Sequence, residues 1–297
     1  MSGYESFAFL TRMQRFLRSL PVAAICAVAL CFAPAAAQNI PSYGDALYQP
    51  TLRQDGKDVM WLPTPDAMVT QMLQAARTKP EDVVIDLGAG EGRIPIAAAK
   101  QFGATAIGIE YDGKMAALAR RNAQRAGVAD KVTIIEGDIF SEDFSRASVV
   151  TLYLLPDLNQ QLRPQLLRMK PGTRVVSYMW DMGEWEPDET FKVDDGEAHL
   201  WTVPAAVAGR WDLRDDRGDP AGEIRLTQQF QRVGGTLTMR GKTQALLGTY
   251  VAGATLGFTF LHADGGVRSV RAMVDGDVLR GHVRFPGSPS PIIGRRS

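Results

Sequence analysis

A glycine-rich loop flanked by carboxylates has the clearest chemical meaning in this sequence. Asp86-Leu87-Gly88-Ala89-Gly90-Glu91-Gly92-Arg93 follows a short apolar run and opens a helical pattern. Gly88, Gly90 and Gly92 permit a tight turn in which a ligand approaches the bare backbone, that of Ala89 included. The helix that follows presents free N–H groups at its start. The loop is therefore predicted to bind a small ligand.

The glycine spacing indicates which ligand this is. A dinucleotide-binding loop reads G-x-G-x-x-G because a pyrophosphate lies against the helix end. Here the third glycine comes one residue early, and Arg93 takes its expected place. Asp86 also precedes the first glycine, where it would repel a pyrophosphate. A carboxylate there suits a ligand with an amino group and a sulfonium, which S-adenosylmethionine has.

Two further acids occur where later strands are expected to end. Glu110 closes the second strand pattern, and Asp138 follows the third. The carboxyl ends of parallel strands form the ligand-binding edge of such sheets. We therefore expect Glu110 to accept the ribose hydroxyls and Asp138 to lie at the same edge.

The elements that must position these residues alternate between strand and helix. Buried strands appear as short apolar runs, and helices as apolar residues at helical spacing. Strands are expected at 83–87, 106–110, 132–135, 148–154 and 174–178, and helices at 66–76, 94–102, 115–126 and 158–169. Residues 191–193 and 199–203 are expected to form an antiparallel edge hairpin. This order predicts an α/β fold, a Rossmann-like doubly wound parallel sheet.

The pattern changes after Pro204. Short alternating runs at 223–231, 236–240, 256–262, 267–274 and 278–285 indicate strands. Gly234-Gly235, Gly265-Gly266 and Asp275-Gly276 occupy expected hairpin turns. Residues 205–297 are thus predicted to form a small all-β C-terminal domain with a meander or barrel-like arrangement of strands.

The N-terminus is typical of a secretory signal peptide. Three arginines precede an apolar stretch at 22–32, and Ala35-Ala36-Ala37 follows it. We expect residues 1–37 to be cleaved and the chain to be exported to the periplasm; an uncleaved membrane anchor is the alternative. Residues 38–60 are then an extended lead-in, and 61–204 the S-adenosylmethionine-dependent domain. Both cysteines, Cys26 and Cys31, would be lost on cleavage, so neither disulfides nor a metal site are expected.

The motifs resemble those of class I S-adenosylmethionine-dependent methyltransferases. The similarity is greatest to the group with the mitochondrial ATP synthase c-subunit lysine N-methyltransferase. It rests on a proline-containing entry at 62–65, the glycine loop, Tyr153-Leu154-Leu155-Pro156, the strand at 171–177 and Trp185-Glu186-Pro187. It covers about residues 60–190. The resemblance implies methyl transfer from S-adenosylmethionine to an amine, with a protein lysine as the expected acceptor. It also implies that Asp138 holds the adenine amino group.

The acceptor is expected at the end of the fourth strand. Many amine-modifying relatives have N/D-P-P-Y there, whereas this chain has Tyr153-Leu154-Leu155-Pro156-Asp157, which argues against adenine or cytosine as acceptor. Tyr153, Pro156 and Asp157 are the catalytic candidates. Trp61, Trp180 and Asp181 are expected to face the substrate, with Asp157 or Asp181 as proton acceptor. Alternatively, Trp61, Trp180 and Trp185 are core residues that cover the sheet edge.

Composition narrows the other possibilities. The 297 residues carry 33 basic and 33 acidic side chains, so no overall basic charge indicates a nucleic-acid partner. A protein or small-molecule amine is the expected partner, with an association with the cell envelope. A small-molecule N- or O-methyltransferase, an exported nucleoside- or ligand-binding protein without turnover, and a nicotinamide oxidoreductase are the alternatives.

Overall fold

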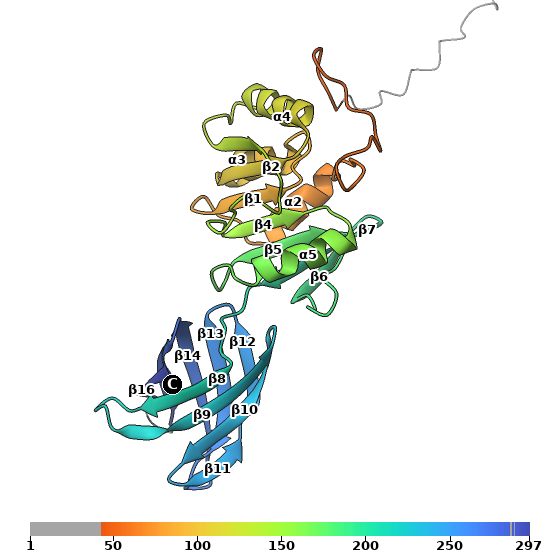
Figure 1. Ribbon diagram of the computed structural model, residues 1–297. Helices are drawn as coiled ribbons and strands as arrows, with labels where there is room; N and C mark the ends of the chain where they lie inside the picture. The colour runs from red at the N-terminus through yellow and green to blue at the C-terminus, as the bar shows by residue number, and fades with distance from the viewer. Residues whose placement is uncertain (1–42, 286, 288) are drawn as a thin grey trace, which may run out of the picture. The chain divides into compact units, whose positions relative to one another are not determined.

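The computed structural model describes residues 43–297 except 286 and 288 (Figure 1). The predicted signal peptide, its cleavage site and both cysteines lie outside the described residues. Two sheets, one of seven strands and one of nine, follow each other along the chain.

The seven-stranded sheet has the strand order β3-β2-β1-β4-β5-β7-β6. Its first five strands are parallel, and β7 pairs antiparallel with both β5 and β6. The strands are β1 (Val83–Leu87), β2 (Thr105–Glu110), β3 (Val132–Glu136), β4 (Val149–Leu152), β5 (Arg174–Tyr178), β6 (Glu189–Val193) and β7 (Gly196–Thr202). The predicted Rossmann-like α/β fold with a parallel sheet is therefore confirmed.

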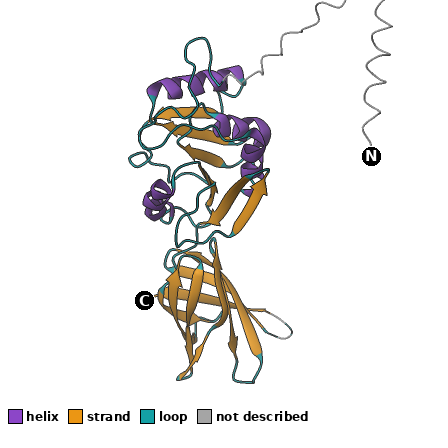
Figure 2. Cartoon of the chain, turned by 90° about the vertical axis from the view of Figure 1, so that its right-hand side faces the viewer, coloured by secondary structure: helices purple, strands orange, loops and turns teal. Residues whose placement is uncertain are grey.

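Helices cover both faces of this sheet, as Figure 2 shows by colour. They are α2 (Asp66–Ala75), α3 (Arg93–Phe102), α4 (Gly113–Arg125) and α5 (Pro156–Leu166). Apolar residues of α2, α3 and α4 pack with the alternate strand residues Val84, Ala106 and Val149. The opposite residues of the strands pack with α5 and with the buried Trp185 and Trp201. Alternation of side chains along each strand thus gives two apolar layers with the sheet between them.

The strand order places the predicted ligand-binding loops together. β1 lies between β2 and β4, so the loops after β1, β2 and β4 leave the same edge of the sheet. β3 continues that edge beside β2. A connection that changes direction after the first strand opens a crevice there, which is where open α/β sheets bind ligands.

The nine-stranded sheet is antiparallel, in the order β11-β10-β9-β8-β16-β15-β14-β13-β12. The strands are β8 (Gly209–Arg214), β9 (Pro220–Gln229), β10 (Arg232–Met239), β11 (Lys242–Ala245), β12 (Leu247–Ala252), β13 (Thr255–Leu261), β14 (Val267–Asp275), β15 (Val278–Arg284) and β16 (Pro289–Arg296). β12 follows β11 directly along the chain, and Thr249 Oγ1 of β12 donates to the carbonyl of Val233 on β10, so the sheet curls until its two ends meet. One face encloses an apolar core that includes Trp211, Phe258 and Leu279.

One expected turn of this sheet is wrong. Gly234-Gly235 lies within β10, and the β9–β10 turn is formed instead by Phe230 and Gln231. Phe230 has a φ of 54°, the left-handed conformation the turn requires. A Cβ on Gly235 would lie 2.2 Å from the carbonyl oxygen of Arg225. Gly235 is thus needed for close approach of neighbouring strands and not for a turn.

Among the residues that the structure describes, no helix is both long enough and apolar enough to cross a membrane.

An ion pair connects elements at the amino-terminal edge of the parallel strands, opposite the edge where the ligand-binding loops lie. Arg174 contacts both carboxylate oxygens of Asp82, at 2.6 and 3.2 Å, and donates to the carbonyls of Ala76 and Ser148. Ser148 Oγ donates to the same carboxylate at 2.7 Å. Burial opposes ionisation of Asp82, but these hydrogen bonds outweigh it and hold the pKa of Asp82 below its ordinary value. The pair therefore joins the starts of β1, β4 and β5 to the end of α2.

We expect Asp82→Asn to lower the free energy of unfolding by about 3 kcal/mol, because it leaves Arg174 partly buried without its counter-charge. Since the pKa of Asp82 is depressed, its contribution is present above the unfolded-state pKa and is lost as the pH falls through the folded one. Urea denaturation at neutral and acidic pH measures both effects. Glu81→Gln is the control, because its pair with Lys79 is exposed, and it should change stability by less than about 1 kcal/mol. Equal losses in the two variants would contradict this account.

Candidate active site

The glycine loop connects β1 to α3 in left-handed turns. Gly88, Gly90 and Gly92 have φ values of 84°, 55° and 85°, which residues with a Cβ rarely adopt. Gly88 and Gly90 line a pocket at the carboxyl edge of the sheet, here called the glycine-loop pocket. Ala89 and Gly92 do not line it: Ala89 is buried, and a Cβ on Gly92 would press on Ala119 of α4. A ligand can therefore contact the backbone at Gly88 and Gly90, whereas Ala89 and Gly92 pack against the rest of the protein.

Asp86 lies at the bottom of the glycine-loop pocket and is 3% exposed. Burial raises the pKa of Asp86 to about 8, although Thr151 Oγ1 donates a hydrogen bond to it at 2.6 Å. The neighbouring carboxyls of Glu110 and Glu91 raise it further. By itself the carboxyl of Asp86 is therefore mostly protonated at neutral pH, and a cationic ligand beside it would cause it to ionise.

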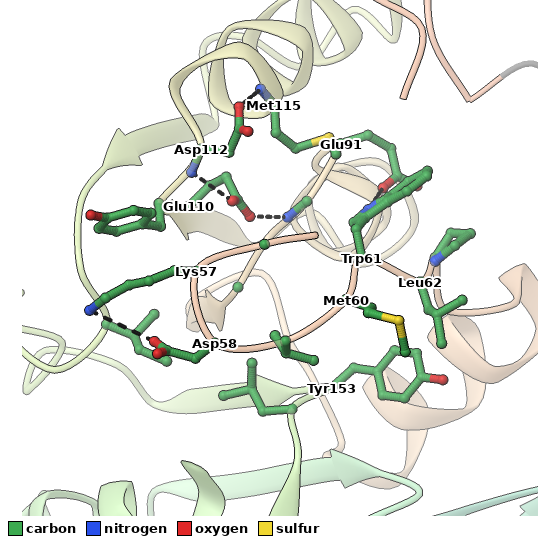
Figure 3. Close-up of a pocket in the computed structure, with 18 of the residues that line it drawn as sticks. Lys57, Asp58, Met60, Trp61, Leu62, Glu91, Glu110, Asp112, Met115 and Tyr153 are labelled. Atoms are coloured by element: carbon green, nitrogen blue, oxygen red, sulfur yellow. Dashed lines mark hydrogen bonds and ion pairs between the residues drawn. The ribbon is translucent and has the colours of Figure 1, made fainter. Parts of the chain in front are cut away.

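Glu110 and Asp138 line the same pocket. Glu110 accepts the backbone N–H groups of Gly90 at 2.8 Å and Asp112 at 2.9 Å, as the dashed lines in Figure 3 show. Burial nevertheless raises the pKa of Glu110. Asp138 is more exposed, and the hydrogen bonds from Lys57 Nζ at 2.7 Å and from the N–H of Phe140 lower its pKa. The three predicted acids thus meet in one pocket, but the pKa values of Asp86 and Glu110 are raised whereas that of Asp138 is lowered.

Residues 53–62, here called the covering loop, cross this pocket (Figure 3). The loop is closed by backbone hydrogen bonds from Arg53 to Trp61, from Trp61 to Gln54 and from Gly56 to Val59. At one end Lys57 reaches Asp138, and at the other Trp61 Nε1 donates to Glu91 Oε2 at 3.1 Å. The segment predicted as an extended lead-in therefore turns back on itself over the glycine loop.

A second pocket, here called the tyrosine pocket, lies on the other side of the covering loop. Its lining includes the loop residues Asp55 and Asp58, and Tyr153, Met179 and Trp180. Tyr153 and Leu154 line both pockets, so the end of β4 separates them. Burial, and then the neighbouring Tyr178, raise the pKa of Tyr153. Tyr153 therefore keeps its phenolic proton at neutral pH and is not a general base there.

The far wall of the tyrosine pocket is a strained turn after β5. Met179 has a φ of 67°, unusual for a residue with a long side chain. Asn159 of α5, fully buried, donates to Ser177 Oγ and to the carbonyls of Trp180 and Asp181. These bonds hold the turn so that Met179 and Trp180 stay exposed at the pocket mouth.

Comparison with known proteins places this geometry in a family. Residues 86–189 match the model of the ANTKMT methyltransferase domain. The chain is 42% identical over 140 residues to a protein-lysine N-methyltransferase of Saccharolobus islandicus, covering 46% of this chain and 87% of that protein. It is 31% identical over 140 residues to the human ATP synthase c-subunit lysine N-methyltransferase, covering 47% of this chain and 57% of the human protein.

The chain belongs to this methyltransferase family. It is an S-adenosylmethionine-dependent methyltransferase, and the class predicted from the sequence is confirmed. A solved RNA methyltransferase of Salinibacter ruber in complex with S-adenosylhomocysteine is 48% identical, with a TM-score of 0.48, and is matched over 49% of this chain and 96% of that chain. The family match ends at residue 189, before the nine-stranded sheet begins.

The remaining predicted site residues of the methyltransferase are dispersed. Trp61 lines the glycine-loop pocket and Trp180 the tyrosine pocket, whereas Trp185 is a core residue. Pro156 begins α5, and Asp157 is exposed in its first turn; neither lines either pocket.

Asp181 also lies outside both pockets, and its carboxylate accepts the N–H of Gly183. Among the described residues, no group of His, Cys, Asp or Glu side chains is arranged to hold a metal ion.

Four residues of the methyltransferase site were missed in the sequence. Glu91 is buried against Arg93 and Trp61, and Lys57 pairs with Asp138. Thr151 and Asn159 hold Asp86 and the Met179 turn. Only Glu91 could have been recognised from the sequence, because it lies within the glycine loop itself.

We expect Asp86→Asn to stabilise the ligand-free methyltransferase while weakening donor binding. The pKa of Asp86 is higher in the folded chain than in the unfolded one, so its contribution favours folding at low pH and is lost as the pH rises from about 4 to 8. At pH 7 the variant should therefore melt roughly 5 °C higher than the wild type, with the gap closing towards pH 4. Thermal denaturation across this range measures it, and Asp130→Asn, at an exposed position, is the control.

The same carboxyl should make donor affinity depend on pH. Wild-type affinity for S-adenosylhomocysteine should rise by up to about tenfold per pH unit below pH 8, because Asp86 must lose its proton to pair with the ligand amine. Titration calorimetry of Asp86→Asn should show weak binding without this slope. Wild-type affinity in the variant would show that Asp86 does not contact the donor.

Proposed function

We propose that this methyltransferase transfers a methyl group from S-adenosylmethionine to the ε-amino group of a lysine in a protein. The single observation behind the proposal is the pair of adjoining pockets that share Tyr153 and Leu154. One pocket suits the donor and the other a long aliphatic amine. The archaeal and vertebrate relatives, which carry lysine N-methyltransferase in their names, support the same acceptor.

The glycine-loop pocket fits the donor. Asp86 is buried and Glu110 is half-buried, and both have raised pKa values, so a ligand ammonium or sulfonium would be paired with charge that burial otherwise suppresses. Gly88 and Gly90 leave the backbone bare beside them. Asp138, with the apolar Ile139, is assigned to the adenine end, and Glu110 to the ribose. The donor supplies an electrophilic methyl carbon whose bond to sulfur breaks as the amine lone pair attacks.

The tyrosine pocket fits a lysine side chain. Its walls are the apolar or aromatic side chains of Tyr153, Leu155, Met179 and Trp180, which can cover a four-carbon chain. Asp55, Lys57 and Asp58 of the covering loop also line the pocket, and Lys57 lies 3.7 Å from Asp58, which leaves Asp55 as the carboxylate that attracts an ammonium. A lysine with a pKa near 10.4 loses its proton at pH 7 at a cost of roughly 4–5 kcal/mol. Partial burial against the aromatic walls lowers that pKa, and the proton leaves to water.

Alignment then accounts for catalysis. An in-line displacement requires the amine nitrogen, the methyl carbon and the sulfur in a row, and proximity of this kind is worth about 7–11 kcal/mol. Tyr153, the residue directly after β4, lines both pockets, and Asn159 fixes the turn with Trp180. The covering loop contributes to both pockets, so it excludes water from the point where they meet.

We expect Trp180→Ala to raise the KM for a protein acceptor about tenfold, roughly 1.4 kcal/mol, with little change in donor affinity. Leu52→Ala is the matched control, because Leu52 is also an exposed apolar residue but lies outside both pockets. The Asp55→Asn and Asp58→Asn double variant should reduce turnover of lysine more than it reduces donor binding.

The assay is incubation with labelled donor and cell-envelope protein, followed by hydrolysis and identification of the labelled amino acid. Methyl-lysine supports the proposal. Label only in small molecules would favour a small-molecule N- or O-methyltransferase, and label in RNA would contradict both assignments. Donor binding without label in any fraction would favour a binding protein without turnover.

We also propose that the chain is exported by cleavage of residues 1–37. The support is the sequence alone: three arginines, the apolar stretch at 22–32 and the alanines at 35–37. Expression of the full chain followed by N-terminal sequencing of the periplasmic protein should give a start at Gln38. An intact N-terminus in the membrane fraction would indicate the uncleaved anchor instead.

A further inference from the structure

The outer face of strands β12–β16 combines exposed arginines with exposed apolar side chains. We call it the arginine face. Its basic residues are Arg271, Arg280, His282, Arg284 and Arg295, and its apolar residues are Leu247, Tyr250, Leu261, Val267, Met273 and Ile293. Many of them line a shallow hollow in the surface of the sheet.

Strand alternation places these residues on one side. Along β14, Val270, Ala272 and Val274 are buried in the core, and the intervening Arg271 and Met273 are exposed. Across the sheet, Met273 is opposite Arg280, and Arg280 is opposite Ile293. Charged and apolar side chains therefore lie next to each other over neighbouring strands.

The arginines of this face have no ion-pair partner among the residues that the structure describes. No carboxylate of residues 43–285, 287 or 289–297 lies within 4.0 Å of the side-chain nitrogens of Arg271, Arg280, Arg284 or Arg295. The hollow itself is lined by no Asp or Glu of the described chain. By contrast, Arg210 and Arg225 on β8 and β9 pair with Glu223 at 3.1 and 2.7 Å. Since acids and bases are equal in number over the whole chain, this is a local excess of positive charge.

The apolar side chains are concentrated in the same place. All of the large exposed apolar side chains of the nine-stranded sheet belong to the arginine face, and Val267 and Met273 are 64% and 56% exposed. Leu261 and Val267 are paired at one end of β13 and β14, and Met273 and Ile293 flank Arg280 towards the other end. Apolar side chains are therefore spread between the arginines over the whole face. A partner must therefore supply negative charge and also bury aliphatic groups.

These two demands favour the surface of a bilayer over a nucleic acid. A nucleic-acid backbone would neutralise the arginines, yet the leucine, valine, isoleucine and methionine side chains would stay in water. The interface of a bilayer provides anionic headgroups beside acyl chains that accept such side chains. We propose that the arginine face binds the surface of a lipid bilayer that carries anionic headgroups.

The test is sedimentation of the full chain with vesicles. Vesicles of phosphatidylglycerol mixed equally with phosphatidylcholine should bind it, and pure phosphatidylcholine vesicles should bind it much less. The Arg271→Gln and Arg280→Gln double variant should weaken binding to the anionic vesicles roughly tenfold or more. The Met273→Ser and Ile293→Ser double variant should weaken it as well, whereas added salt should affect only the arginine-dependent part.

The matched control is Arg210→Gln with Arg225→Gln, which removes the same charge from β8 and β9 and should leave binding unchanged. Melting temperatures and methyl transfer confirm that every variant is folded. Three results would overturn the proposal: equal binding to neutral vesicles, wild-type binding by the arginine-face variants, or arginine-dependent binding of a single-stranded RNA without binding of vesicles.

Discussion

The arrangement of this methyltransferase depends on a carboxyl group buried at the carboxyl edge of a parallel sheet. Asp86 is enclosed by β1, β4 and the glycine loop, with Thr151 as its hydrogen-bond partner. Burial beside Glu91 and Glu110 suppresses its charge. An isolated ionised carboxylate in that place would be costly, so the pocket is complete electrostatically only when it holds a cation. The ligand-free pocket therefore already favours a positively charged ligand.

The covering loop links this pocket to the acceptor side. Lys57 and Trp61 satisfy Asp138 and Glu91, two acids at opposite ends of the glycine-loop pocket. The same loop places Asp55 and Asp58 in the tyrosine pocket. Because one short segment contributes to both pockets, a shift that accommodates the donor must also change the wall that the acceptor meets.

The parts of the site that follow the sheet could be predicted from sequence. Asp86, Glu110 and Asp138 stand at successive strand ends, and parallel topology alone brings them together. The contacts of Lys57 and Asn159 join segments that are 81 and 18 residues apart in sequence. No local pattern marks such contacts. The turn predicted at Gly234-Gly235 was wrong for a related reason. In sequence, a glycine required for the close approach of two strands cannot be distinguished from one required for a turn.

Large exposed apolar side chains of this chain occur in two groups that are candidate sites for binding partners. One group, which includes Met60, Leu155 and Trp180, surrounds the tyrosine pocket, and the other forms the arginine face. Elsewhere in the described part of the nine-stranded sheet, no large apolar side chain is exposed, and Arg225 is paired with Glu223. Leaving apolar groups in water costs free energy that folding does not recover. A protein acceptor with an apolar surface around its lysine would bury the first group, as an anionic bilayer would bury the second. A methyltransferase with both surfaces is suited to acceptors found at a membrane.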